Sequence, residues 1–172
     1  MKILKTKIKG LLLLKTSIYK DKRGFFKEVE KNKILKKKFI FDCFSYSKKN
    51  TLRGMHLQTK KSQAKIITVV QGKILDVVVD LRKNSKTYGK HFKIILSEKN
   101  GKHLFVPQGF AHGILGLNKE NILHYACSNY RDPKSEVSIK WNDVDLKINW
   151  GIKKPIISKK DSLASSLKDF KK

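Results

Sequence analysis

Polar side chains suited to proton transfer gather in three short segments of the sequence, at residues 21–28, 52–65 and 107–113. His56 lies in the second segment, and because an imidazole titrates near neutrality it can act as a base. Tyr125 follows the third segment at the distance of one strand, and a phenol with a pKa of about 10 stays protonated until it donates. Lys65 could stabilise an oxyanion that develops beside them. Together these residue types predict proton abstraction next to a carbonyl group.

Histidines in two separate segments also suggest a metal site. Residues 101–112 follow the spacing Gly-x5-Pro-x-Gly-x2-His of metal-binding jelly rolls, which would make His112 one ligand. The first half of such a site requires His-x-His, with a glutamate a few residues later. Here the residue two positions after His56 is Gln58, and no glutamate follows within the next ten residues. Because two imidazoles and an amide form a poor divalent site, we expect no metal.

Short apolar segments separated by turns predict the elements that carry these residues. From residue 65 onward, strands are expected at intervals of about 8–12 residues, which is the spacing of a sandwich or barrel. The expected strands cover residues 66–70, 74–81, 90–96, 103–106, 110–117 and 122–130. A helical pattern is limited to residues 29–39 and the segment after Ser162. The predicted fold is all-β, a cupin-type jelly roll with a few short helices, in a single domain over residues 1–172.

The spacing of Arg53 and His56 places a requirement on their strand. Side chains three residues apart in a regular strand point to opposite faces, so the two could not share a site there. Gly54 lies between them, and a glycine inside a strand often marks a bulge. We therefore predict a bulge at Gly54. The histidines at positions 91, 103 and 124 lie outside the three polar segments, and we expect structural roles for them.

The net charge of +26 dominates the composition. Such a charge would favour a nucleic-acid partner through contacts with phosphates. However, only four of the 40 basic residues are arginine, and the lysines are spread along the whole chain. Nucleic-acid sites favour arginine with interleaved aromatic residues. We interpret the lysines as a solvated compositional bias and expect no nucleic-acid partner.

The sequence predicts a soluble, cytoplasmic protein with no membrane partner. Its longest apolar run, residues 11–14, is far shorter than the roughly 18–20 residues that a bilayer span requires. Lysines at positions 2, 5, 7, 9 and 15 leave no apolar core for a signal peptide. Cys43 and Cys127 cannot form a disulfide framework, and we expect both to be buried small apolar residues.

Several linked motifs resemble those of one enzyme family. They are Leu-Arg-Gly-Met-His-Leu-Gln at 52–58, Gln-Ala-Lys at 63–65, Asp-Val-Val-Val-Asp-Leu-Arg at 76–82, Pro-Gln-Gly-Phe-Ala-His-Gly at 107–113 and Ser-Lys-Lys-Asp at 158–161. From about residue 8 to residue 162 the chain resembles the dTDP-4-dehydrorhamnose 3,5-epimerases, cupin-fold enzymes of activated-sugar biosynthesis. The resemblance implies epimerisation of a nucleotide-linked 4-keto-6-deoxyhexose at C3, C5 or both, without a cofactor. It also implies a homodimer, often with N-terminal strands exchanged between subunits.

The resemblance further implies a role for each matching residue. His56 would be the base, Asp161 would accept a hydrogen bond from the other nitrogen of its ring, and Tyr125 would deliver a proton from the opposite face. Lys65 and His112 would border the reacting sugar and its developing oxyanion. The remaining matching positions would contact the substrate: Arg23, Phe26, Glu28, Arg53, Gln58, Arg131, Glu136 and Lys160.

Two positions depart from the family pattern on the nucleotide side. Where the family usually has Gln-x-Asn, this chain has Phe41-Asp42-Cys43. Where it often has a pair of tyrosines, this chain has Tyr130-Arg131. We therefore hypothesise that the chemistry is retained while the nucleotide or the sugar differs. Three alternatives stay open: inversion of one carbon only, a related ketoisomerase, or a non-catalytic cupin that binds a sugar nucleotide.

Overall fold

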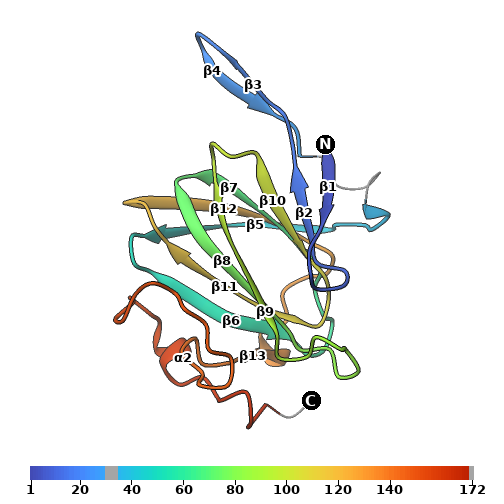
Figure 1. Cartoon of the computed structure of the whole chain (residues 1–172), viewed down its shortest axis with the longest axis vertical. Helices are drawn as coiled ribbons and strands as arrows, with labels where there is room; N and C mark the ends of the chain where they lie inside the picture. The colour runs from blue at the N-terminus through green and yellow to red at the C-terminus, as the bar shows by residue number, and fades with distance from the viewer. Residues whose placement is uncertain (30–34, 171–172) are drawn as a thin grey trace.

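Two antiparallel sheets that pack face to face and a separate hairpin make up the described chain (Figure 1). The computed structural model describes residues 1–29 and 35–170. In order, the first sheet contains β1 (Lys2–Lys5), β2 (Leu12–Lys15), β10 (Lys102–Val106), β7 (Lys65–Gln71), β12 (Glu120–Cys127) and β5 (Phe41–Lys48). The second contains β13 (Glu136–Ser138), β6 (Leu52–Gln58), β11 (Phe110–Gly116), β8 (Lys73–Asp80) and β9 (His91–Ser97). The hairpin pairs β3 (Ile18–Asp21) with β4 (Gly24–Lys27).

The all-β jelly roll predicted from the sequence is confirmed. Every strand expected from residue 65 onward is present, as β7 to β12, with ends that differ by a few residues. The turn at Gly72 carries the chain from β7 in the first sheet to β8 in the second. Gly72 has a φ of +87°, and a Cβ there would come within 2.2 Å of the carbonyl oxygen of Glu120. Only glycine fits this crossing point.

Within the two predicted helical segments, the described residues are helical only at Leu35. Residues 36–40 are irregular, and residues 30–34 lie outside the described residues. The segment after Ser162 is irregular because it bonds to the body of the protein; for example, the Leu167 N–H donates to the Asp143 carboxylate at 2.8 Å. The described helical elements are η1 (Pro133–Ser135) and α2 (Lys159–Ser162). No helix in residues 1–29 and 35–170 is long and apolar enough to cross a membrane.

The main apolar core lies between the two sheets. The first sheet contributes residues such as Ile67 and Leu123, and the second contributes Val78 and Ile114. A second cluster, which includes Trp150 of the C-terminal segment, packs against the second sheet and buries Val77 and Val79 of β8. Burial on both faces explains why β8 is almost continuously apolar. The second sheet is therefore a firmly packed wall for any site that lies between the sheets.

Two of the remaining histidines have partners that suit the structural roles expected of them. His103 is fully buried and its Nδ1 lies 2.9 Å from the hydroxyl of Thr68. Burial, together with the charge of Lys27, lowers the pKa of His103 to about 4. His124 pairs with Asp42 at 2.7 Å.

A buried carboxylate, Asp80, organises the turn that follows β8. It accepts two hydrogen bonds from Arg82, at 2.8 and 2.7 Å, and one from each hydroxyl of Ser85 and Thr87, both at 2.6 Å. The guanidinium of Arg82 also lies 4.4 Å from the ring centroid of Phe110. Burial acts to raise the pKa of Asp80, but the hydrogen bonds outweigh it and hold this pKa far below its ordinary value.

The substitution Asp80→Asn is expected to lower the free energy of unfolding at pH 7 by about 3–5 kcal/mol, because it removes one partner of a largely buried ion pair. Since the folded-state pKa is depressed, this stabilisation is present above the unfolded pKa of about 3.9 and is lost as the pH falls below it. Urea unfolding at pH 7 and at pH 3 should show a smaller difference between the two proteins at pH 3. An equal difference in the free energy of unfolding at both pH values would contradict a depressed pKa of Asp80 in the folded protein.

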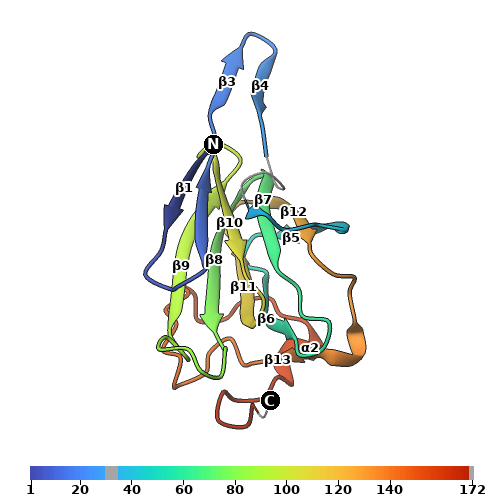
Figure 2. The same ribbon diagram turned by 90° about the vertical axis from the view of Figure 1, so that its right-hand side faces the viewer.

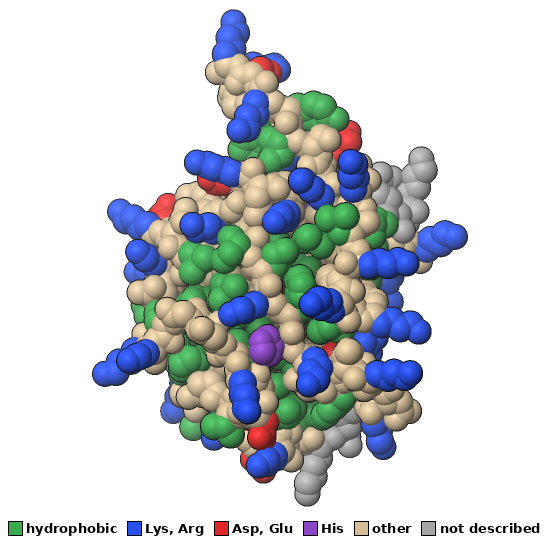
Figure 3. Space-filling view, viewed as in Figure 1, with side chains coloured by type: hydrophobic (Ala, Val, Ile, Leu, Met, Phe, Trp, Pro, Cys, Tyr) green, Lys and Arg blue, Asp and Glu red, His purple; other side chains and the backbone are tan. Residues whose placement is uncertain are grey.

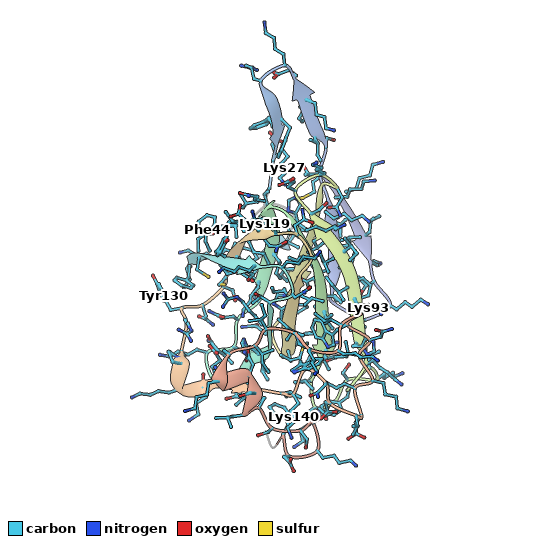
Figure 4. The ribbon with its side chains drawn as sticks, turned by 90° about the vertical axis from the view of Figure 1, so that its left-hand side faces the viewer. Lys27, Phe44, Lys93, Lys119, Tyr130 and Lys140 are labelled. Carbon is cyan, nitrogen blue, oxygen red and sulfur yellow. The ribbon has the colours of Figure 1, made fainter. Side chains whose placement is uncertain are left out.

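The hairpin of β3 and β4 projects away from the two sheets, as two perpendicular views show (Figures 1 and 2). Its rings are uncovered, with Tyr19 60% and Phe26 62% exposed. Where the hairpin joins the body (Figure 4), Lys27 donates to the carbonyl oxygens of Val69 and Glu98, both at 3.2 Å. An isolated two-stranded hairpin is marginally stable in water, so this element requires a surface to pack on.

Basic side chains are distributed over the face of the molecule that Figure 3 shows. Figure 3 shows Lys and Arg side chains standing singly across one whole face, rather than gathered into a patch. The absence of a nucleic-acid partner stays a prediction.

Candidate active site

A cavity of about 620 Å³ lies between the two sheets. Its walls come from β5, β7 and β12 of the first sheet, β6 and β11 of the second, and residues 156–158 and 161 of the C-terminal segment. Most of the residues predicted for the site line this cavity: Arg53, His56, Gln58, Lys65, His112, Tyr125, Arg131, Glu136 and Asp161. Phe41 and Cys43, at which the chain departs from the family pattern, line the cavity as well.

An imidazole–carboxylate pair forms one wall of the cavity. His56, on β6, lies with its Nε2 2.5 Å from Oδ1 of Asp161. Asp161 is held in the first turn of α2, where its N–H donates to the hydroxyl of the capping residue Ser158 at 3.1 Å. Burial acts to raise the pKa of Asp161, but hydrogen bonds and the charge of His56 hold it below its ordinary value. An ionised Asp161 fixes the ring so that Nδ1 is the nitrogen free to take a proton.

The bulge predicted at Gly54 is confirmed. On β11, His112 and Ile114 are two positions apart, whereas their partners His56 and Arg53 on β6 are three positions apart. Gly54 has a φ of +119°, and a Cβ there would lie 2.6 Å from the His112 carbonyl oxygen. The extra residue lets the side chains of Arg53 and His56 reach the same cavity.

Arg53 is held in place at the cavity wall by β5. Its Nε donates to the hydroxyl of Ser47 at 2.9 Å, and its Nη2 donates to the carbonyl oxygen of Tyr46 at 2.8 Å. These two bonds leave further guanidinium N–H groups for an anionic ligand, because the group has five. A fixed guanidinium suits phosphate oxygens.

A partly buried phenol comes from the facing sheet. Tyr125, on β12, packs against the main core, and its hydroxyl lies 3.3 Å from that of Ser45. Burial raises the pKa of Tyr125 well above its ordinary value, so the phenol stays protonated at neutral pH. The imidazole of His112 lies near it, with ring centroids 6.3 Å apart. The cavity therefore has a possible base on one sheet and a possible acid on the other.

Asp76 was not predicted from the sequence to belong to the site. This residue is fully buried in β8, and its Oδ2 lies 2.9 Å from Nε2 of His112, which is itself buried. The pair fixes the orientation of the His112 ring at the cavity wall. The position of Asp76 in the middle of an apolar strand could have indicated this pair, because a carboxylate is rarely buried without a polar partner.

A second charged group lies at the rim of the cavity. Glu136 accepts hydrogen bonds from Arg131, at 3.2 Å, and from Lys160. Burial acts to raise the pKa of Glu136, but its bonds to Lys160 and Arg131 and the nearby His56 lower it overall. Lys160 was predicted to contact substrate, yet it does not line the cavity because its ammonium group pairs with Glu136 instead.

Three predicted substrate contacts are far from the cavity within one chain. Arg23 and Phe26 are on the projecting hairpin, and Glu28 follows it as an exposed residue. Arg23 bonds to its neighbour Asp21 at 2.6 Å. These three residues do not line the cavity of their own chain, because β3 and β4 extend away from the sheets, and their contact with substrate stays a prediction.

No group of three or more His, Cys, Asp or Glu side chains able to hold a metal ion occurs in residues 1–29 and 35–170. The imidazoles of His56 and His112 are instead each paired with a carboxylate.

A jelly roll with charged and titratable groups in a cavity between its sheets defines the cupin class of enzymes. A model of the family described as dTDP-4-dehydrorhamnose 3,5-epimerase matches residues 5–169. The enzyme of that name from Methanothermobacter thermautotrophicus is 39% identical over 168 residues, which cover 93% of this chain and 91% of the relative. The chain belongs to the dTDP-4-dehydrorhamnose 3,5-epimerase family and is an enzyme of the isomerase class.

Solved structures support the same conclusion. The dTDP-6-deoxy-D-glucose-3,5-epimerase of Legionella pneumophila, in complex with dTDP-4-keto-L-rhamnose, is 36% identical with a TM-score of 0.94, covering 99% of this chain and 94% of that one. A 3'-monoepimerase of Streptomyces bikiniensis, in complex with dTDP-quinovose, is 27% identical with a TM-score of 0.88, covering 95% and 86%.

Proposed function

We propose that this enzyme inverts C3 and C5 of a dTDP-linked 4-keto-6-deoxyhexose, with His56 as base and Tyr125 as acid. The observation that carries the proposal is the placement of the two groups on facing sheets, with the cavity between them. Inversion requires this arrangement, because a proton must leave one face of a planar enolate and return to the other. Exchange of the C3 and C5 protons with solvent deuterium tests the proposal.

Each inversion has two proton transfers. His56 Nδ1 takes the proton from the carbon next to the C4 ketone, and the electron pair of that C–H bond moves into the carbonyl group to give an enolate. Lys65 and His112 stabilise the negative oxygen. The enolate then takes the Tyr125 proton from the opposite face, and water restores both residues. The ketone itself acidifies both carbons, so the residues of this chain are sufficient without a cofactor.

The nucleotide is expected to occupy the part of the cavity that contains the departing residues Phe41, Cys43 and Arg131. Because side chains of a different chemical kind occupy the wall there, we expect weak discrimination between bases. In a competition assay, dTDP should bind less than about tenfold, or 1.4 kcal/mol, more tightly than UDP, CDP or GDP. A much wider margin for dTDP would contradict this hypothesis and show that the altered wall still selects thymine.

The projecting hairpin supports a homodimer. Its exposed aromatic rings require a packing surface, and the outer face of the first sheet carries an apolar cluster that includes the partly buried Leu12 and Phe105. If the hairpin of one subunit packs on the other, Arg23 and Phe26 would be able to contact substrate in the partner's cavity rather than in their own. This arrangement would restore the substrate contacts that the single chain lacks.

A mixture of two inactive variants tests the homodimer. Arg23→Ala/Phe26→Ala damages only the hairpin, and His56→Asn damages only the cavity. Refolding the two together should restore activity, because each hybrid dimer then contains one intact cavity facing one intact hairpin. Each variant refolded alone is the control. If the mixture were no more active than the variants alone, the hairpin would not complete a partner's site.

A further inference from the structure

The cavity wall contains two cysteine side chains in contact. Cys43 on β5 lies opposite Tyr125 in the ladder, and Cys127 lies two residues further along β12, so both thiols face the same side. Both line the cavity. Cys127 is buried as expected, but Cys43 is only half-buried, because it forms part of the open wall. The expectation that both are buried apolar residues is therefore wrong for Cys43.

The surroundings of Cys43 favour its thiolate. The Cys127 S–H donates a hydrogen bond to the Cys43 sulfur, and this bond is the main cause that lowers the pKa of Cys43. Burial and Asp42 oppose the shift, whereas the positive charges of Lys65 and Arg131 add to it, and the resulting pKa is about 7. The same contact and burial raise the pKa of Cys127 far above its ordinary value. The pair thus has one reactive and one inert thiol.

We propose that Cys43 is a covalent modification site for soft electrophiles inside the substrate cavity. With iodoacetamide, the Cys43 sulfur forms a bond to the methylene carbon, the carbon–iodine bond breaks, and iodide leaves. Cys127 acts as a positioning residue that stabilises the attacking sulfur through its hydrogen bond. The proposal rests on the proposed function in one respect: because the thiol lies in the wall assigned to the nucleotide, a bound nucleotide shields it and a thioether blocks the site.

Labelling followed by peptide mass spectrometry tests the site without any measurement of activity. At pH 7, iodoacetamide should modify Cys43 at least on the order of tenfold faster than Cys127, with a rate that has its pH midpoint near 7. The substitution Cys127→Ala should raise that midpoint and slow the labelling at pH 7. Equal rates at the two cysteines, or a midpoint like that of a free thiol near 8.5, would overturn the proposal.

Saturation with dTDP then links the thiol to the substrate cavity. It should slow the labelling of Cys43, and labelled wild-type protein should lose activity in proportion to the modified fraction. The Cys43→Ser variant, treated in the same way, should keep whatever activity it had before treatment. If Cys43 labels rapidly but the protein exchanges no substrate protons, the proposed function fails while the thiol site stands. If dTDP leaves the labelling rate unchanged, the placement of the thiol at the nucleotide is wrong.

Discussion

The substitution His56→Asn is expected to reduce the rate of epimerisation by about 10²–10⁴-fold, the usual contribution of a general base. Asparagine is too short to replace the bond from Nε2 to Asp161, but that carboxylate still accepts a hydrogen bond from the N–H of Gly54 at 3.4 Å. The amide cannot accept the substrate proton at neutral pH, so the loss of the base accounts for the expected decrease in rate. Product formation measured by NMR gives the rate for each protein.

The matched control for this experiment is His91→Asn. His91 lies on the edge strand β9 and does not line the cavity, so its replacement should leave the rate within a few-fold of wild type. If His56→Asn retained near wild-type activity, another group would have to be the base. The neighbouring imidazole of His112 would be the first candidate, because it lies directly opposite His56 in the ladder.

The substitution Tyr125→Phe is expected to separate proton removal from inversion. His56 remains able to take a proton and return it from the same face, so exchange with solvent should continue. Inversion should fall by about 10²–10⁴-fold, because the opposite face has lost its donor. The ring still fills the core, and the lost hydrogen bond with Ser45 should cost only about 0.5–1.5 kcal/mol of folding stability.

Two quantities measure how far exchange and inversion are separated. They are the deuterium incorporated into recovered substrate and the amount of epimerised product. Tyr88→Phe is the control, since Tyr88 is a partly exposed tyrosine outside the cavity. Equal losses of exchange and inversion in Tyr125→Phe would mean that the phenol is also needed for proton removal. Unchanged inversion would mean that another group, or water, protonates the opposite face.

The strands and the bulge could be predicted from the sequence because they depend on residues that are close together in the chain. The strands from residue 65 onward follow from apolar runs between turns, and the bulge at Gly54 follows from the position of a glycine between two residues that need one face. The helical pattern after Ser162 failed for a non-local reason. There the chain bonds to Asp143 and Ser138, and these contacts outweigh the weak helical preference.

The site itself depends on contacts that no local pattern contains. His56 and Asp161 are 105 residues apart, and only the resemblance to a family connected them before the structure did. The bond between Asp76 and His112 joins two strands that are separated in sequence, and it was not predicted. The placement of Arg23 away from its own cavity depends on where a hairpin projects, which the spacing of residues cannot determine.

Proton exchange in heavy water tests the central claim most directly. The wild-type protein would be incubated with dTDP-4-keto-6-deoxyglucose, and the C3 and C5 protons of the sugar followed by NMR, with His56→Asn in parallel. We expect both protons to exchange in the wild type and both exchanges to be lost in the variant. Exchange at one carbon only would contradict double inversion and indicate a monoepimerase. Exchange that persists in His56→Asn, or no exchange in the wild type, would contradict the account of the site.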